Sequence, residues 1–114
     1  MANRMYPERN REVVQRGRAL APQQQAAFEA FSSAVFADGA LTGREKQLIA
    51  VAVAHTTQCP YCIKGHTRSA LAKGATPEQV MEAIWVAAEM RAGGAYAHST
   101  LALDVIHEAS AEDD

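Results

Sequence analysis

The stretch from Leu41 to Ala54 restricts the fold of this chain more than any other part of the sequence. It opens with Thr42-Gly43-Arg44-Glu45, a capping box in which the threonine hydroxyl accepts from an amide of the first helical turn while the glutamate returns to the threonine amide. Residues 48–54 are then apolar on every side of a helix. A buried strand is the alternative for such a run, but the capping box and the alanines argue against it. We expect a central buried helix that starts at Gly43.

The composition agrees with a fold made of helices. Of the 114 residues, 48% are hydrophobic but only 6% are aromatic, which favours closely packed helices over a β-sandwich. A chain of this length forms one domain, near the low end of what buries a sufficient core alone. We therefore expect a single-domain all-α protein of about five helices, residues 1–114, that associates with copies of itself.

Proline, glycine and capping signals divide the rest of the chain. Pro22 and Pro60 suit the first turn of a helix, and Thr76-Pro77-Glu78-Gln79 is a second capping signature. A first helix is expected from about Pro7 to Leu20, and the helix from Pro22 should end at Asp38-Gly39. The helix around the two cysteines should reach Lys73 and stop at Gly74. Gly93-Gly94 marks a tight break, so the sequence predicts one helix that ends at Arg91 and another from about Ala95.

Apolar residues spaced by three and four positions indicate which helix faces are buried. On the second helix the spacing selects Phe28, Phe31 and Val35. On the helix after Thr76 it selects Val80, Ile84, Ala87 and Ala88. On the last helix it selects one stripe made of His98, Leu101, Ala102, Val105 and Ala109.

The charge balance and the apolar runs limit the partners and the location of the protein. The formal net charge is −2, and the five arginines of the first twenty residues are spread among polar residues, as on a solvated helix face or a contact to a neighbouring subunit. The opening Met-Ala-Asn-Arg lacks the apolar core of a signal peptide, and no run of eighteen apolar residues occurs. We expect a cytoplasmic protein that binds neither nucleic acid nor membranes.

Both cysteines lie in Cys59-Pro60-Tyr61-Cys62, and His66 follows four residues after the second one. On a helix, offsets of three and four place Cys59, Cys62 and His66 on one face. Pro60 suits the first helical position, which makes Cys59 the cap or a neighbour of the cap. A thiolate is favoured both by the N-terminus of a helix and by a nearby imidazole. In a reducing compartment such a pair is catalytic or metal-binding more often than structural.

The spacing gives each of these three residues a chemical role. His66 can take the proton of Cys62 directly or through one water, and the two sulfurs can close a disulfide across one helical turn. That loop is so small that it suits reversible chemistry better than a structural link. One alternative is two small buried side chains and a surface histidine. Another is a zinc site, which would need a fourth ligand from elsewhere because no second CxxC exists. We expect neither a metal nor a cofactor.

The residues from Leu41 to Ala54, the CxxC pair with His66, and the later Met90-Arg91-Ala92-Gly93-Gly94-Ala95 resemble the carboxymuconolactone decarboxylase superfamily, and within it the AhpD-like alkylhydroperoxidase branch. The resemblance covers about residues 38–106. It implies an all-α fold, assembly into homotrimers or homohexamers, and a dithiol that reduces a hydroperoxide and is then reduced by a thiol or dithiol electron donor, whose identity the sequence leaves open. The decarboxylase branch lacks the cysteine pair.

One position departs from the pattern of that branch. Its proton relay uses a glutamate twelve residues before the first cysteine, and here that residue is Gln47. Glutamine can form hydrogen bonds but cannot accept and release a proton at neutral pH. Glu45 is turned away by about 200° along the helix, which leaves it the capping role. His55 and His98 are the further candidates for a supporting role beside the site.

Two classes of function follow from these features. The first is a thiol-dependent peroxidase or disulfide reductase in which Cys59, Cys62 and His66 act on a hydroperoxide, with Cys62 favoured as the sulfur that meets the peroxide. The second is a non-redox protein of the same fold, either a decarboxylase-like enzyme that acts on a lactone or an oligomeric binding module.

Overall fold

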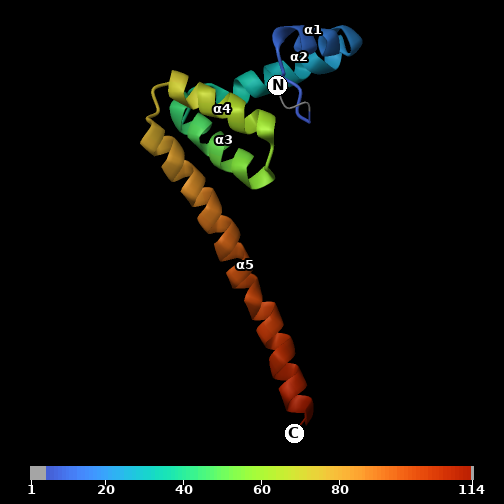
Figure 1. Ribbon diagram of the computed structural model, residues 1–114, viewed down its shortest axis with the longest axis vertical. Helices are drawn as coiled ribbons and strands as arrows, with labels where there is room; N and C mark the ends of the chain where they lie inside the picture. Colours follow the sequence, from blue (N-terminus) through green and yellow to red (C-terminus); the bar gives the residue numbers. More distant parts are fainter. Residues whose placement is uncertain (1–4, 114) are drawn as a thin grey trace.

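A computed structural model describes residues 5–113, and these residues form helices and no strand (Figure 1). The all-α prediction is confirmed. Residues 1–4, on which the expectation about a signal peptide rested, lie outside the described range. The five helices are α1 (Arg11–Leu20), α2 (Pro22–Phe36), α3 (Gly43–Thr57), α4 (Pro60–Ala72) and α5 (Pro77–Asp113).

The core lies where α3 packs against α4 and against the first part of α5 (Figure 1). Its buried residues are Val51, Ala70, Ala75 and Val80, with Leu48 and Ile84 packed at the edge. Small side chains dominate this set, which lets the helix axes approach closely. The predicted central helix is therefore confirmed on one side only, because Ile49 and Val53 on its other side are about half exposed.

Local signals in the sequence set the starts of three helices as predicted. The capping box of α3 forms in both directions, with the Glu45 amide donating to Thr42 Oγ1 at 3.1 Å and the Thr42 amide donating to Glu45 Oε1 at 2.8 Å. Thr76 and Gln79 repeat this exchange at the start of α5, at 2.9 and 3.1 Å. Pro60 is the first residue of α4. These bonds satisfy amides that the first helical turn leaves without a partner.

The first helix begins later than predicted, at Arg11 and not at Pro7. Asn10 is its cap, because the Asn10 side chain accepts from the Val13 amide at 2.9 Å. The preceding residues lie against α4 instead, where the Tyr61 hydroxyl donates to the Pro7 carbonyl at 2.8 Å and the ring of Tyr6 meets that of Tyr61 edge to face. A long-range contact thus competes with the helical pattern of this segment.

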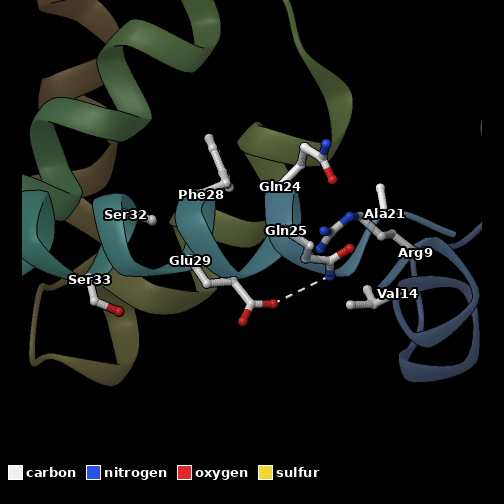
Figure 2. A pocket seen from close by; sticks show the side chains of 9 residues that line it. All are labelled: Arg9, Val14, Ala21, Gln24, Gln25, Phe28, Glu29, Ser32 and Ser33. Carbon is white, nitrogen blue, oxygen red and sulfur yellow. Dashed lines mark hydrogen bonds between the residues drawn. The ribbon is translucent and has the colours of Figure 1, made fainter. Parts of the chain in front are cut away.

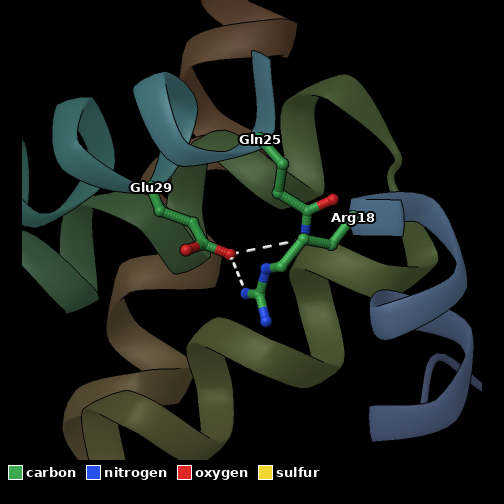
Figure 3. Close-up of polar contacts among 3 residues, drawn as sticks. All are labelled: Arg18, Gln25 and Glu29. Carbon is green, nitrogen blue, oxygen red and sulfur yellow. Dashed lines mark hydrogen bonds and ion pairs between the residues drawn. The ribbon is translucent and has the colours of Figure 1, made fainter. Parts of the chain in front are cut away.

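Polar side chains join α1 to α2. Arg18 forms an ion pair with Glu29, to which Gln25 also donates a hydrogen bond (Figure 3). The hydrogen bond from Arg18 holds the pKa of the Glu29 carboxyl below its usual value, and that from Gln25 adds to the effect. Because both ends of the ion pair are about half exposed, solvent screens it and it fixes the helix pair only weakly.

The predicted break at Gly93-Gly94 is wrong, since α5 runs without interruption over 37 residues. At 1.5 Å per residue this helix is about 55 Å long. A glycine inside a helix costs only about 1 kcal/mol relative to alanine. The strong helix formers around the pair, among them Met90, Ala92 and Ala95, offset that cost. Two glycines are therefore not enough to end the helix, whereas a proline, which removes a backbone hydrogen bond, would be.

Two predicted buried faces are exposed in the single chain. Phe28 and Phe31 are 67% and 65% exposed, because little of α2 packs against the other helices of the chain. The stripe on the second half of α5 is open as well, with Leu101 at 66%, since that half projects away from the other helices (Figure 1). The radius of gyration is 20.4 Å, against about 13 Å for a compact chain of this length. Further predicted members of these two faces that are exposed are Val35, His98, Ala102, Val105 and Ala109. On the face predicted for the helix after Thr76, Ala88 is exposed as well.

We predict that Thr76→Ala lowers the free energy of unfolding by about 1 kcal/mol, because the first turn of α5 loses a side-chain cap. Urea denaturation followed by circular dichroism measures the change. Thr100→Ala, on the exposed part of α5, is the matched control and should stay within a few tenths of a kcal/mol. Equal midpoints for the two variants would contradict the capping role.

Candidate active site

The two cysteines lie at the start of α4, directly after the end of α3. Gln58 ends α3 in the left-handed region with φ 59°, and the Cys59 amide donates back to the Ala54 carbonyl at 3.2 Å. Cys59 is the N-cap of α4, and its sulfur accepts from the Cys62 amide at 3.3 Å. Both thiols are free and half-buried. The sequence therefore folds into the predicted arrangement of two sulfurs one turn apart at a helix N-terminus.

The two thiols differ in acidity because one donates to the other. A hydrogen bond from the Cys62 thiol, followed by one from the Cys62 amide, lowers the pKa of Cys59 below its usual value. The same thiol contact raises the pKa of Cys62, and burial adds to this effect, while the positive charge of Arg9 acts against it. Cys59 is thus the more acidic thiol of the pair.

His66 is held by contacts from two other helices. Its Nδ1 lies 2.8 Å from Oε1 of Gln47 on α3, and its ring stacks on Phe36 of α2 with centroids 5.2 Å apart and planes at 25°. An amide oxygen only accepts hydrogen bonds, so Nδ1 must carry the proton. This leaves Nε2 of the neutral ring free to accept a proton.

A pocket of about 420 Å³ opens beside these residues, between α2, α3 and α4. Cys62 and His66 form part of its wall, and most of the remainder is aliphatic or aromatic. Its other lining residues are Val35, Phe36, Lys46, Ile49, Ala50, Val53, Ala54 and Thr57. The ammonium of Lys46 is engaged with the Ala37 carbonyl at 2.6 Å. The pocket therefore suits a small, largely apolar molecule that presents its reactive group to a sulfur and an imidazole.

The structure brings together four of the predicted residues, namely Cys59, Cys62, His66 and Gln47. Within residues 5–113 no hydrogen bond joins Cys62 to His66, so a proton passing between them needs a water or a side-chain rotation. His55 and His98 do not line the pocket in the single chain. Each of these two rings instead pairs through Nδ1 with a backbone carbonyl of its own helix, that of Val51 and Gly94 respectively.

Other features of the described residues carry less chemistry. A larger hollow of about 750 Å³ lies between α1 and α2, lined by residues such as Arg9, Gln24 and Glu29 (Figure 2), but it contains no cysteine or histidine. Between residues 5 and 113 no group of three acidic, cysteine or histidine side chains is placed to hold a metal ion. Over the same range, no helix combines the length and the apolar character needed to cross a membrane.

Sequence reasoning missed Phe36 and Arg9. Phe36 is one position beyond the stripe of Phe28, Phe31 and Val35, and no local pattern predicts that it stacks on a histidine thirty positions later. Arg9 was grouped with the other N-terminal arginines, and its influence on Cys62 depends on the packing of the N-terminal segment against α4. Both contacts are tertiary, so periodicity could not have found them.

Comparison with known proteins identifies the family of the chain. The family model described as the carboxymuconolactone decarboxylase family matches residues 22–104. The chain is 70% identical over 82 residues to "Uncharacterized protein 4 in cox locus" of Paracoccus denitrificans, which covers 72% of this chain and 74% of that protein. It is 36% identical over 96 residues to a protein of Cupriavidus necator, covering 84% of each chain.

Two crystal structures share the fold. One, of a protein from Methanobacterium thermoautotrophicum, superposes with a TM-score of 0.68 at 37% identity and covers 73% of this chain and 93% of that one. The other is an apo carboxymuconolactone decarboxylase family protein from Legionella pneumophila, with a TM-score of 0.67 at 32% identity and 83% and 85% coverage. By the extent of these matches, the chain belongs to the carboxymuconolactone decarboxylase family.

Proposed function

We propose that this protein is a thiol-dependent peroxidase that reduces organic hydroperoxides with the Cys59 and Cys62 pair. The observation that carries the proposal is the placement of both thiols at the start of α4, with Cys62 and His66 on the wall of one apolar pocket. An apolar wall favours an alkyl or aryl hydroperoxide over hydrogen peroxide, because burying the carbon chain adds binding free energy. Such a cycle suits the cytoplasm, where reductants for the disulfide are present.

In the first step the Cys62 sulfur attacks the terminal oxygen of the hydroperoxide. The O–O bond breaks, the alcohol leaves with a proton, and Cys62 becomes a sulfenic acid. His66 Nε2 takes the thiol proton, through a water where needed, and returns a proton to the departing alkoxide. Cys62 is assigned this role because it lines the pocket, whereas Cys59 does not.

In the second step Cys59 attacks the sulfenic acid. The S–O bond breaks, hydroxide leaves and becomes water with the proton that Cys59 gives up, carried by His66 or a water, and a disulfide closes across one turn of α4. The lowered pKa of Cys59 supports this role, since a thiolate is the attacking species. The sum is two thiols and one hydroperoxide giving a disulfide, an alcohol and water, and two electrons from a thiol donor then restore the pair.

Gln47 acts as a positioning residue in this scheme. Its buried amide accepts from Nδ1 of His66, which fixes the ring so that Nε2 is the basic nitrogen. It adds no charge, so it does not stabilise the imidazolium as a carboxylate would. We therefore expect a modest rate near neutral pH.

The first test is the product of oxidation. One equivalent of an organic hydroperoxide should produce an intramolecular Cys59 to Cys62 disulfide, seen by mass spectrometry as two sulfurs that resist alkylation. Cys59→Ser should instead accumulate a sulfenic acid at Cys62. Accumulation at Cys59 in a Cys62→Ser protein, and not the reverse, would overturn the order of the two steps. If both thiols can still be alkylated after the oxidation, the peroxidase proposal is wrong and the non-redox class of function remains.

The different acidities of the two thiols predict the order in which they react with an alkylating reagent. The lowered pKa of Cys59 and the raised pKa of Cys62 should make Cys59 the first to react with iodoacetamide as the pH rises toward the usual thiol value. Cys62 should follow only at higher pH. Peptide mapping after short pulses at several pH values measures both rates, and equal rates throughout would refute the hydrogen bond between the thiols.

Substituting Gln47 tests the positioning role. Gln47→Glu should raise the peroxidase rate about tenfold near pH 7, less than the full contribution of a positioned acid or base, because the carboxylate stabilises the imidazolium of His66. Gln47→Ala should lower the rate, and Gln24→Glu, on exposed α2, is the matched charge control. No gain with glutamate together with a large loss in His98→Ala would show that the proton passes through His98 instead.

We also propose that the protein assembles into homotrimers or homohexamers. The exposed apolar faces of α2 and of the second half of α5 support this, because a single chain leaves them in water. Sedimentation at micromolar concentration should give three or six times the chain mass, and Leu101→Glu should lower it. A wild-type protein that sediments only as a monomer would contradict the proposal.

A further inference from the structure

A second pocket, of about 600 Å³, lies on the other side of the start of α4. The N-terminal segment forms one of its walls and α4 the other, and the Tyr61 hydroxyl bond to the Pro7 carbonyl and the Tyr6 to Tyr61 ring contact tie these walls together. Its lining residues are Tyr6, Pro7, Glu8, Arg9, Pro60, Tyr61, Lys64, Gly65 and Arg68. None of these lines the apolar pocket beside Cys62 and His66. We call this second pocket the basic pocket.

Three cationic side chains and one carboxylate line the basic pocket. Lys64 and Arg68 are one helical turn apart and so share a face of α4, and Arg9 reaches the pocket from the opposite wall. Within residues 5–113, neither these three cations nor Glu8 belongs to an ion pair, because the pair found there joins Arg18 to Glu29. The basic pocket therefore holds an excess of positive charge that a ligand with two carboxylates would match.

The basic pocket also lies next to the dithiol. Pro60 and Tyr61, which line it, are the two residues between Cys59 and Cys62. A molecule held there would have its thiol close to the disulfide while the apolar pocket stays open to the hydroperoxide. One side of the start of α4 is thus apolar, as an organic hydroperoxide requires, and the other side is cationic, as an anionic reductant requires.

We propose that the basic pocket binds a small thiol that carries at least two carboxylates, and that this acidic thiol is the reductant of the Cys59 to Cys62 disulfide. The inference rests on the proposed peroxidase function. The thiolate of the first molecule attacks one sulfur, the protein disulfide breaks, and the released cysteine takes a proton. A second thiol attacks the mixed disulfide, which frees the other cysteine and yields the oxidised small molecule. Two electrons pass to the protein and two thiols are consumed.

The first experiment compares two probes, glutathione, which has two carboxylates, and cysteamine, which has none. The rate at which each reduces the oxidised full-length protein is measured for wild type, for Lys64→Gln/Arg68→Gln and for the control Arg16→Gln, which lies outside the pocket. The ratio of the glutathione to the cysteamine rate cancels the intrinsic reactivity of the disulfide. It should fall about tenfold in the double variant, the size expected for a lost charge-assisted hydrogen bond, and stay constant in the control. An unchanged ratio in the double variant would overturn the proposal.

A binding measurement separates this inference from the peroxidase function. Calorimetry with S-methylglutathione, on a Cys59→Ser/Cys62→Ser protein that cannot react, should show binding that the added Lys64→Gln/Arg68→Gln changes abolish. Binding of that kind would support the site even where hydroperoxide oxidises no thiol. Peroxidase activity without any binding of S-methylglutathione would overturn the small acidic thiol as reductant and leave the peroxidase function standing. Binding that survives loss of both cations would place the ligand elsewhere and also overturn the proposal.

Discussion

The hydrogen bond from Nδ1 of His66 to Oε1 of Gln47 connects the packed core to the candidate active site. Gln47 is a buried polar side chain on α3, where the other buried side chains are aliphatic. Without a hydrogen-bond partner inside the protein, its amide would lower the free energy of unfolding by about 1–3 kcal/mol. His66 is that partner, one helix away. Meeting this requirement orients the imidazole and sets its tautomer, so the position of His66 depends on how α3 and α4 pack.

The start of α4 places two different electrostatic environments within one turn. Cys59, as the cap, receives hydrogen bonds from Cys62 and lies at the positive end of the helix. Cys62 lines an apolar pocket, and its hydrogen bond to Cys59, with burial adding to the effect, raises its pKa. A pair of equal thiols would compete for the same reaction, whereas this asymmetry suits the separate steps that the proposed peroxidase cycle gives to the two sulfurs. The identical spacing on a helix interior would provide neither the free amides nor the dipole end that creates the difference.

The parts that the sequence predicts well are those decided within a few residues. Thr42 with Glu45, Thr76 with Gln79, and Cys59 followed by Pro60 each specify a helix start through bonds over three positions, and all three are present. Long-range packing decides the rest. The stacking of Phe36 on His66 and the contact of Tyr61 with Pro7 join residues 30 and 54 positions apart. The continuity of α5 through Gly93 depends on the helix propensity of all the surrounding residues, which the Gly93-Gly94 pair alone does not reveal. Burial was over-predicted because apolar spacing identifies a face without stating which chain covers it.

The second half of α5 is an example of an apolar face that the sequence identifies but that nothing among residues 5–113 of the single chain covers. Helices gain most of their stability from packing of an apolar face and little from propensity alone, yet Leu101, Val105 and Ile106 are each about 60% exposed or more in the single chain. A segment of this kind becomes more stable as a helix when something removes its face from water. The same holds for Phe28 and Phe31 on α2, the helix that supplies Phe36 to the imidazole. Covering α2 would therefore also restrain the Phe36 ring that stacks on His66, so a surface that packs there would act on the orientation of the imidazole as well as on stability.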